Sequence, residues 1–131
     1  MPVRYTIDDR DLMITEVSGE FTVDEDLEAL GEIIRKTNGD AFYKNRLFII
    51  GSDTTFHNVD LKELERVRDV LRQWSDIYPG RDVRTAFVTR DSQASAFVKM
   101  WQAVALANPV VGSSIQLFAD ETDAVRWLKA K

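Results

Sequence analysis

The stretch from Asn45 to Leu71, NRLFIIGSDTTFHNVDLKELERVRDVL, decides the fold of this chain. Residues 47–50 are four consecutive apolar residues, which is typical of a short strand covered on both faces of a sheet. A polar loop over residues 51–58 follows that strand. A long helix is then predicted from Asp60, because Asp60 and Glu63 have the spacing of a capping box. A buried strand, a loop and a long amphipathic helix in this order are typical of an α/β sheet.

The long helix continues beyond this stretch. Apolar residues recur along it at the spacing of one helix face, and Pro79–Gly80 is expected to end it. This apolar stripe consists of Leu61, Leu64, Val67, Val70, Leu71, Trp74 and Ile77.

On the N-terminal side, the pattern predicts two strands and a helix. Residues 3–8 alternate between apolar and polar side chains, and residues 12–17 have strand character. The polar turn between these two segments predicts an antiparallel hairpin. Thr22 stands three residues before a glutamate and is expected to cap a helix that ends at Asn38–Gly39.

On the C-terminal side, strands and helices continue to alternate. Strands are predicted over 83–88 and 114–118. Ser92 is expected to cap a third helix that runs to about Ala107, and Asp120 is expected to cap a C-terminal helix. The predicted order is β-β-α-β-α-β-α-β-α, which gives one α/β domain over residues 1–131 with a mixed five-stranded sheet and four helices.

The composition of the chain excludes several classes of function. The 131 residues include no cysteine, which rules out disulfides, thiolate catalysis and cysteine zinc sites. A net charge of −5 argues against nucleic-acid binding through bulk charge. The sequence has no apolar run long enough for a transmembrane segment and no visible secretory signal, so a cytoplasmic location is expected.

Two C-terminal segments resemble a known family. Residues 83–88, VRTAFV, and residues 115–128, IQLFADETDAVRWL, are similar to the fourth strand and the ending of the SpoIIAA-like superfamily. STAS domains share this fold, and the lipid-binding lobe of Sec14/CRAL-TRIO proteins is related to it. The resemblance implies a SpoIIAA-like fold and, through the lipid-carrying relatives, a lipid-like ligand. Anti-sigma-factor antagonists of this group carry a phosphorylatable serine where this chain has Asn58-Val59-Asp60-Leu61, which contains no hydroxyl residue.

The polar loop over residues 51–58 is the first candidate site. It follows the central strand at its carboxyl end, where open α/β sheets place their ligand crevices, and it leads into a helix N-terminus that favours anions. A hydrophilic connector is the competing interpretation, since the Asp60 carboxylate already occupies part of that helix terminus. The candidate binding residues in the loop are Ser52, Asp53, Thr54, Thr55 and His57.

The helix over residues 92–107 is the second candidate site. Its apolar arc is wider than the face of one sheet requires. The surplus can contact a protein partner, form a homodimer or wall a pocket for an apolar ligand, and a well-buried helix is the competing interpretation. The candidate binding residues in this helix are Phe97, Val98, Met100 and Trp101.

These observations predict a non-enzymatic binding or regulatory domain that engages a protein partner or an apolar, lipid-like ligand. No catalytic residue, metal site or cofactor is predicted, because neither a nucleophile motif, nor metal-ligand spacing, nor a phosphate loop is present. A phospho-regulated switch at Ser52, Thr54 or Thr55 is the alternative. A hydrolase using His57 with Asp53 is the weaker alternative. The strand exit at Arg90-Asp91-Ser92 is a second position at which an anion could bind.

Overall fold

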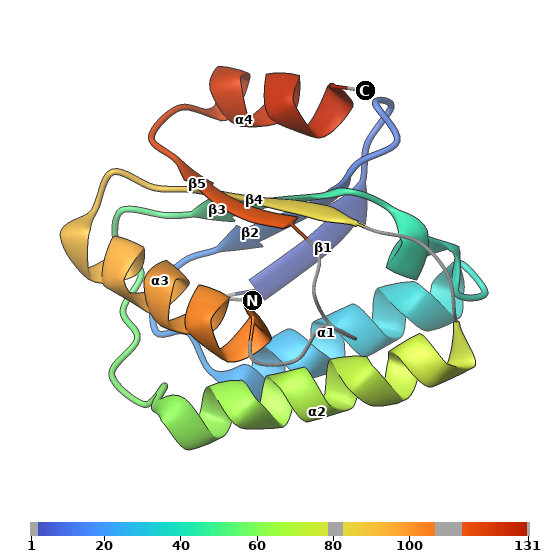
Figure 1. Cartoon of the computed structure of the whole chain (residues 1–131), viewed down its shortest axis with the longest axis horizontal. Helices are drawn as coiled ribbons and strands as arrows, with labels where there is room; N and C mark the ends of the chain where they lie inside the picture. The colour runs from blue at the N-terminus through green and yellow to red at the C-terminus, as the bar shows by residue number, and fades with distance from the viewer. Residues whose placement is uncertain (1–2, 79–82, 107–113, 131) are drawn as a thin grey trace.

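The computed structural model describes residues 3–78, 83–106 and 114–130 and has an α/β architecture (Figure 1). The strands are β1 (Val3–Ile7), β2 (Met13–Val17), β3 (Arg46–Ile50), β4 (Arg84–Val88) and β5 (Ser114–Phe118). The helices are α1 (Val23–Lys36), α2 (Leu61–Ile77), α3 (Ser92–Leu106) and α4 (Glu121–Lys129), and a short 3-10 helix, η1 (Asp40–Tyr43), precedes β3. The predicted order of strands and helices is confirmed within the described residues.

The five strands form one mixed sheet in the order β1-β2-β3-β4-β5. β1 pairs antiparallel with β2, which confirms the predicted hairpin, and β2 to β5 pair in parallel, which confirms the predicted mixed sheet. Helices α1, α2 and α3 lie on one face of the sheet and α4 lies on the other face (Figure 1). This arrangement gives the sheet two separate apolar cores.

The central strand β3 belongs to both cores, which confirms its predicted burial on both faces. Its neighbouring residues Leu47 and Phe48 point to opposite faces of the sheet, as successive strand residues do. Phe48 packs into the larger core beneath α1, α2 and α3. Leu47 packs into the smaller core, where Ala124 and Leu128 of α4 cover the sheet.

Three predicted helix caps are confirmed by hydrogen bonds to backbone N–H groups. Thr22 Oγ1 accepts from the backbone N of Glu25 at 3.3 Å, and Asp60 Oδ1 accepts from the backbone N of Glu63 at 2.9 Å. Asp120 caps α4 in the same way. These contacts fix where each helix leaves the loop before it, since free N–H groups at a helix start need acceptors.

The predicted cap of α3 was wrong by one residue. Asp91 is the cap, because its Oδ2 accepts from the backbone N of Ala94 at 2.9 Å, and Ser92 lies inside the helix. The Asp91 carboxylate thus occupies the helix N-terminus at which the sequence analysis placed a second possible anion. Arg90, the cation expected beside that anion, donates from Nε to the carbonyl of Ala119 at 3.1 Å.

Two predicted helix ends lie outside the described residues. These are the stop of α2 at Pro79–Gly80 and the end of α3 near Ala107. None of the helices in the described ranges combines the length and the apolar content that crossing a membrane requires.

Candidate functional site

The first half of the candidate loop is fastened to the end of β2. Thr54 is buried, and its Oγ1 donates a hydrogen bond to the carbonyl of Val17 at 3.1 Å. The backbone N of Gly51 donates to the same carbonyl at 2.9 Å. The backbone N of Thr54 donates to the carbonyl of Gly51 at 3.1 Å, which forms a turn. A Cβ atom on Gly51 would lie 2.9 Å from that Val17 oxygen, so only glycine fits this close approach. The role of Thr54 is therefore structural.

Replacing Thr54 by valine is expected to lower the free energy of unfolding by about 1–1.5 kcal/mol, because it leaves a buried carbonyl without one of its donors. Urea denaturation of both proteins measures the change. Thr55→Val is the matched control, since the Thr55 side chain makes no hydrogen bond within the described residues. A control as destabilised as Thr54→Val would contradict the assigned role.

The second half of the loop pairs with the segment between β2 and α1. The backbone N of Thr55 donates to the carbonyl of Gly19 at 2.8 Å, and the backbone N of Phe21 donates to the carbonyl of Thr55 at 2.9 Å. Asn58 Nδ2 donates to Glu20 Oε1 at 2.6 Å. Two neighbouring loops at the carboxyl ends of β2 and β3 thus form one ordered unit.

Three of the predicted loop residues remain exposed. Ser52, Asp53 and His57 all face solvent, and Ser52 is the most accessible hydroxyl of the three predicted phosphorylation positions. Within the described part of the chain, His57 and Asp53 share no hydrogen bond or ion pair. The geometry therefore offers the hydrolase hypothesis no paired base, whereas the exposed tip is open to a partner.

An aromatic cluster joins the candidate loop to α3. Phe56 stacks on Phe97 with ring centroids 4.1 Å apart and planes at 13°. Phe21 contacts both rings, at 5.5 Å from Phe56 and 5.6 Å from Phe97. The two regions selected from sequence are thus neighbours in the structure. Phe56 and Phe21 were missed, although an aromatic residue inside a polar loop is a signal that the loop packs on the core.

The predicted apolar surplus on α3 is mostly core. Phe97 and Trp101 are buried, and Val98 is 0% exposed, so these three side chains cannot contact a partner from the surface. The physical reason is that α3 packs against α2 as well as against the sheet, and two neighbours require a wider apolar arc than one. Of the four candidate residues in this helix, Met100 alone is therefore exposed.

One narrow stripe of α3 does face solvent. Met100 is 40% exposed, and Ala96 and Ala103 are exposed at positions −4 and +3 from it. Residues at this spacing lie on one face of a helix, with Lys99 beside them. These three residues form an apolar stripe along two helical turns of the outward face, which Lys99 shares. We call Ala96, Met100 and Ala103 the α3 stripe.

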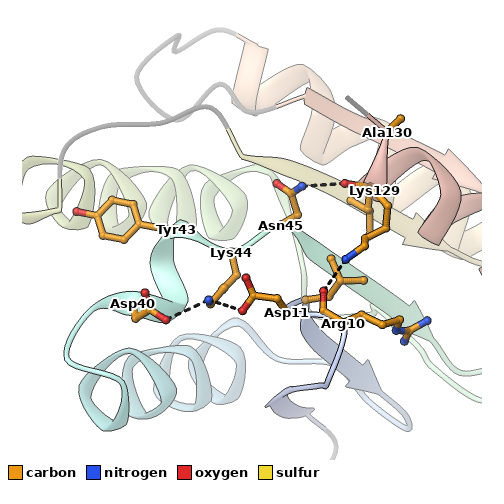
Figure 2. A pocket seen from close by; sticks show the side chains of 10 residues that line it. Arg10, Asp11, Asp40, Tyr43, Lys44, Asn45, Lys129 and Ala130 are labelled. Atoms are coloured by element: carbon orange, nitrogen blue, oxygen red, sulfur yellow. Dashed lines mark hydrogen bonds and ion pairs between the residues drawn. The ribbon is translucent and has the colours of Figure 1, made fainter.

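A polar pocket of about 380 Å³ lies at the opposite end of the strands from the candidate loop, just before the N-terminus of β3 (Figure 2). Lys44 Nζ sits between the carboxylates of Asp11, at 2.5 Å, and Asp40, at 3.1 Å. Lys129 Nζ donates to the carbonyl of Arg10 at 2.9 Å. Both lysines are thus engaged in joining the hairpin turn, η1 and α4.

Asn45 is the centre of the contacts beside this pocket. Its Nδ2 donates to the carbonyl of Leu128 at 2.9 Å, and its Oδ1 accepts from the backbone N of Arg84 at 3.0 Å. Its own carbonyl accepts from the backbone N of Met13 at 2.9 Å. The Arg84 guanidinium lies 5.5 Å from the Trp127 ring and donates to the Trp127 carbonyl at 2.7 Å. This residue pair therefore holds α4 on the sheet.

A polar cluster lies between the sheet and α1 and consists of Thr15 and Asp26, which are buried, and Tyr5 and Arg46, which are partly buried. Tyr5 donates from its hydroxyl to Asp26 Oδ1 at 2.5 Å, and Asp26 is 6% exposed. Burial raises the pKa of Asp26 to about 6. The hydrogen bond from Tyr5 and the positive charge of Arg46 lower this pKa, but burial has the larger effect. Burial and the Asp26 charge raise the pKa of Tyr5 well above its usual value, and burial lowers the pKa of Arg46.

Sequence reasoning missed this cluster entirely. Asp26 stands in the first turn of α1, where an acidic residue is favoured by the helix dipole and needs no further explanation. A period of 3.6 gives a weak signal, because Asp26 is four residues before Leu30, on the buried face. Among the described residues, no group of three or more acidic or histidine side chains could hold a metal ion.

Comparison with protein-family models, with curated proteins and with solved structures finds no match to this chain. The function proposed below therefore depends on geometry and chemistry alone.

Proposed function

We propose that this chain is a non-enzymatic binding domain that contacts a protein partner through the α3 stripe and the exposed tip of the neighbouring loop. One observation supports the proposal above all: Met100 is 40% exposed between two exposed alanines, and the remaining apolar side chains that the structure describes in this helix are buried. Small flanking residues leave room for a partner to approach the helix closely. Ser52, Asp53 and His57 would supply the polar rim that surrounds such apolar contacts.

A protein partner is favoured over an apolar small molecule by the shape of the site. The α3 stripe is an outward helix face, whereas small-molecule sites are concave and mostly apolar. The polar pocket next to Asn45 has several charged side chains in its lining and lies at the opposite end of the strands. A SpoIIAA-like assignment is part of the proposal and is supported by the order of strands and helices. The cytoplasmic location stays a prediction.

Affinity capture with three forms of the chain tests the proposal. Wild-type protein, Met100→Glu and Ile77→Glu are each used as bait in the same extract. Ile77 is 64% exposed at the end of α2 far from α3, so Ile77→Glu is the matched control (Figure 1). A protein retained by wild type and by Ile77→Glu but lost by Met100→Glu supports the α3 stripe as the contact surface. Identical retention by all three forms would overturn it.

Met100→Glu is expected to weaken partner binding by roughly tenfold or more, because a carboxylate at the centre of an apolar contact must lose its hydration. Its free energy of unfolding is expected to stay within about 0.5 kcal/mol of wild type, since the side chain is exposed. Thermal unfolding checks the second expectation and separates a lost contact from a lost fold.

Native mass spectrometry of gently purified protein distinguishes the other two possible ligands of the α3 stripe, a second copy of the chain and an apolar small molecule. A dimer that Met100→Glu converts to a monomer would identify the partner as a second copy of the chain. A retained molecule of lipid-like mass would instead favour the apolar-ligand alternative, and would contradict the protein-partner proposal if Met100→Glu released it.

A further inference from the structure

Two buried polar atoms of the Tyr5–Thr15–Asp26–Arg46 cluster have no hydrogen-bond partner in the protein. They are Thr15 Oγ1, which lies near the Tyr5 hydroxyl but outside hydrogen-bond geometry, and Arg46 Nε. Thr15 is 1% exposed, so its hydroxyl has no direct route to bulk solvent. Buried polar groups in folded proteins are nearly always paired with protein atoms or with ordered water. Two orphaned atoms in one cluster therefore indicate a shared partner.

The sheet register brings these groups to one place. Tyr5 and Thr15 face each other across the β1–β2 pair, and Arg46 pairs with Met13, two residues before Thr15 on the same side of β2. All of them point to the face that α1 covers, from which Asp26 projects to the Tyr5 hydroxyl. The four side chains thus converge between three strands and one helix.

The two charges of the cluster interact without touching. Arg46 and Asp26 form no ion pair within 4.0 Å, whereas the positive charge of Arg46 still lowers the pKa of Asp26. The Arg46 guanidinium lies 5.4 Å from the Phe42 ring, which contacts one of its faces. Arg46 is partly buried, with its Nε inaccessible to solvent, and a separation of this kind between opposite charges is commonly bridged by water, which can accept from the cation and donate to the carboxylate.

We propose that a water molecule binds inside this cluster, accepting a hydrogen bond from Arg46 Nε, pairing with Thr15 Oγ1 and donating to the Asp26 carboxylate. Buried waters typically make about three hydrogen bonds to groups that would otherwise be unsatisfied, and this site offers three. The water completes an ion pair that links β3 to α1, while the Tyr5 hydroxyl links β1 to the same carboxylate. This site is separate from the α3 stripe and does not depend on the proposed function.

Nuclear magnetic resonance on ¹⁵N-labelled full-length protein tests the proposal with water itself as the probe. The Arg46 Nε–H cross-peak is assigned by its disappearance in Arg46→Lys. Cross-relaxation with the water resonance is then compared in the laboratory and rotating frames, which distinguishes a long-lived bound water from proton exchange. Arg126, exposed on α4, is the internal control for an arginine in contact with bulk solvent.

The expected result is a cross-peak of long-lived water at Arg46 Nε–H that is absent at Arg126 and lost in Thr15→Val. Valine has the shape of threonine without the hydroxyl, and urea denaturation establishes that the variant is folded. Absence of the water cross-peak in wild type overturns the proposal. A cross-peak that persists at full intensity in Thr15→Val overturns the assignment of Thr15 as a partner. A high-resolution crystal structure with a direct Arg46 Nε–Asp26 hydrogen bond would likewise refute the bound water.

Discussion

Replacing Asp26 by asparagine is expected to raise the free energy of unfolding by about 2–3 kcal/mol at pH 8 and to leave it nearly unchanged at pH 4. Burial raises the pKa of this carboxyl from 3.8 to about 6 in the folded protein. Ionised Asp26 is therefore less favourable in the folded chain than in the unfolded chain, and asparagine removes that charge. The hydrogen bond from Tyr5 is kept, because the asparagine carbonyl can accept it.

The sign of the pH dependence follows from proton binding. Between pH 4 and pH 6 the folded protein holds the Asp26 proton more tightly than the unfolded chain, so this group makes stability fall as pH rises through that window. Tyr5, which faces Asp26, keeps its proton there, since its raised pKa lies far above this window, and the positive charge of Arg46 is already part of the balance that sets the Asp26 pKa. The difference in free energy of unfolding between Asp26→Asn and wild type should therefore increase between pH 4 and pH 6 and remain constant above pH 6.

Urea denaturation at a series of pH values measures this difference. Asp24→Asn is the matched control, because it makes the same chemical change in the same helical turn at an exposed position paired with Arg66. The control is expected to change stability by less than about 1 kcal/mol, because an exposed ion pair contributes little. Equal pH profiles for the two variants would show that Asp26 is not the titrating group.

Replacing Asn45 by alanine is expected to lower the free energy of unfolding by about 2–4 kcal/mol. The change removes two side-chain hydrogen bonds and leaves the backbone N of Arg84 and the carbonyl of Leu128 without those partners. Both groups lie where α4 meets the sheet, so the substitution should mainly weaken the packing of α4 on the sheet. Hydrogen exchange should accordingly rise first in residues 121–129.

Asn58→Ala is the control for this experiment. Asn58 also makes a side-chain hydrogen bond, to Glu20 Oε1 at 2.6 Å, but both groups are on the surface. Water replaces a lost bond of this kind, so the expected change is within about 0.5 kcal/mol. If both variants lose the same stability, Asn45 does not have the central role that the geometry indicates.

Local patterns predicted the elements of the fold because each of them depends on neighbouring residues. The apolar run at 47–50 and the caps at Thr22, Asp60 and Asp120 act within a few residues of chain, and all are confirmed. The α3 cap was displaced by one residue because Asp91 and Ser92 are both good capping residues, and only the path of the chain decides between them.

The candidate site was harder to predict because burial depends on partners that are distant in sequence. The apolar arc of α3 predicted surplus surface, but α2 covers much of it, and a single sequence does not give the packing of one helix against another. The Tyr5–Asp26 pair joins residues 21 positions apart, and Arg46 reaches them from a third segment. The helical spacing of Asp26 from Leu30 is only a weak sign of a buried carboxylate, since the helix dipole alone explains an acidic residue in the first turn.

The position of α4 has a consequence for synthesis of the chain. All five strands precede α4, and α4 covers the face of the sheet on which Leu47 and Ala86 lie. At ribosomal rates, on the order of seconds separate the emergence of β3 from that of α4, so the nascent sheet presents a bare apolar face during that interval. A chaperone bound to that face would have to leave before α4 can pack on it, so the smaller core forms only after all five strands have been synthesised.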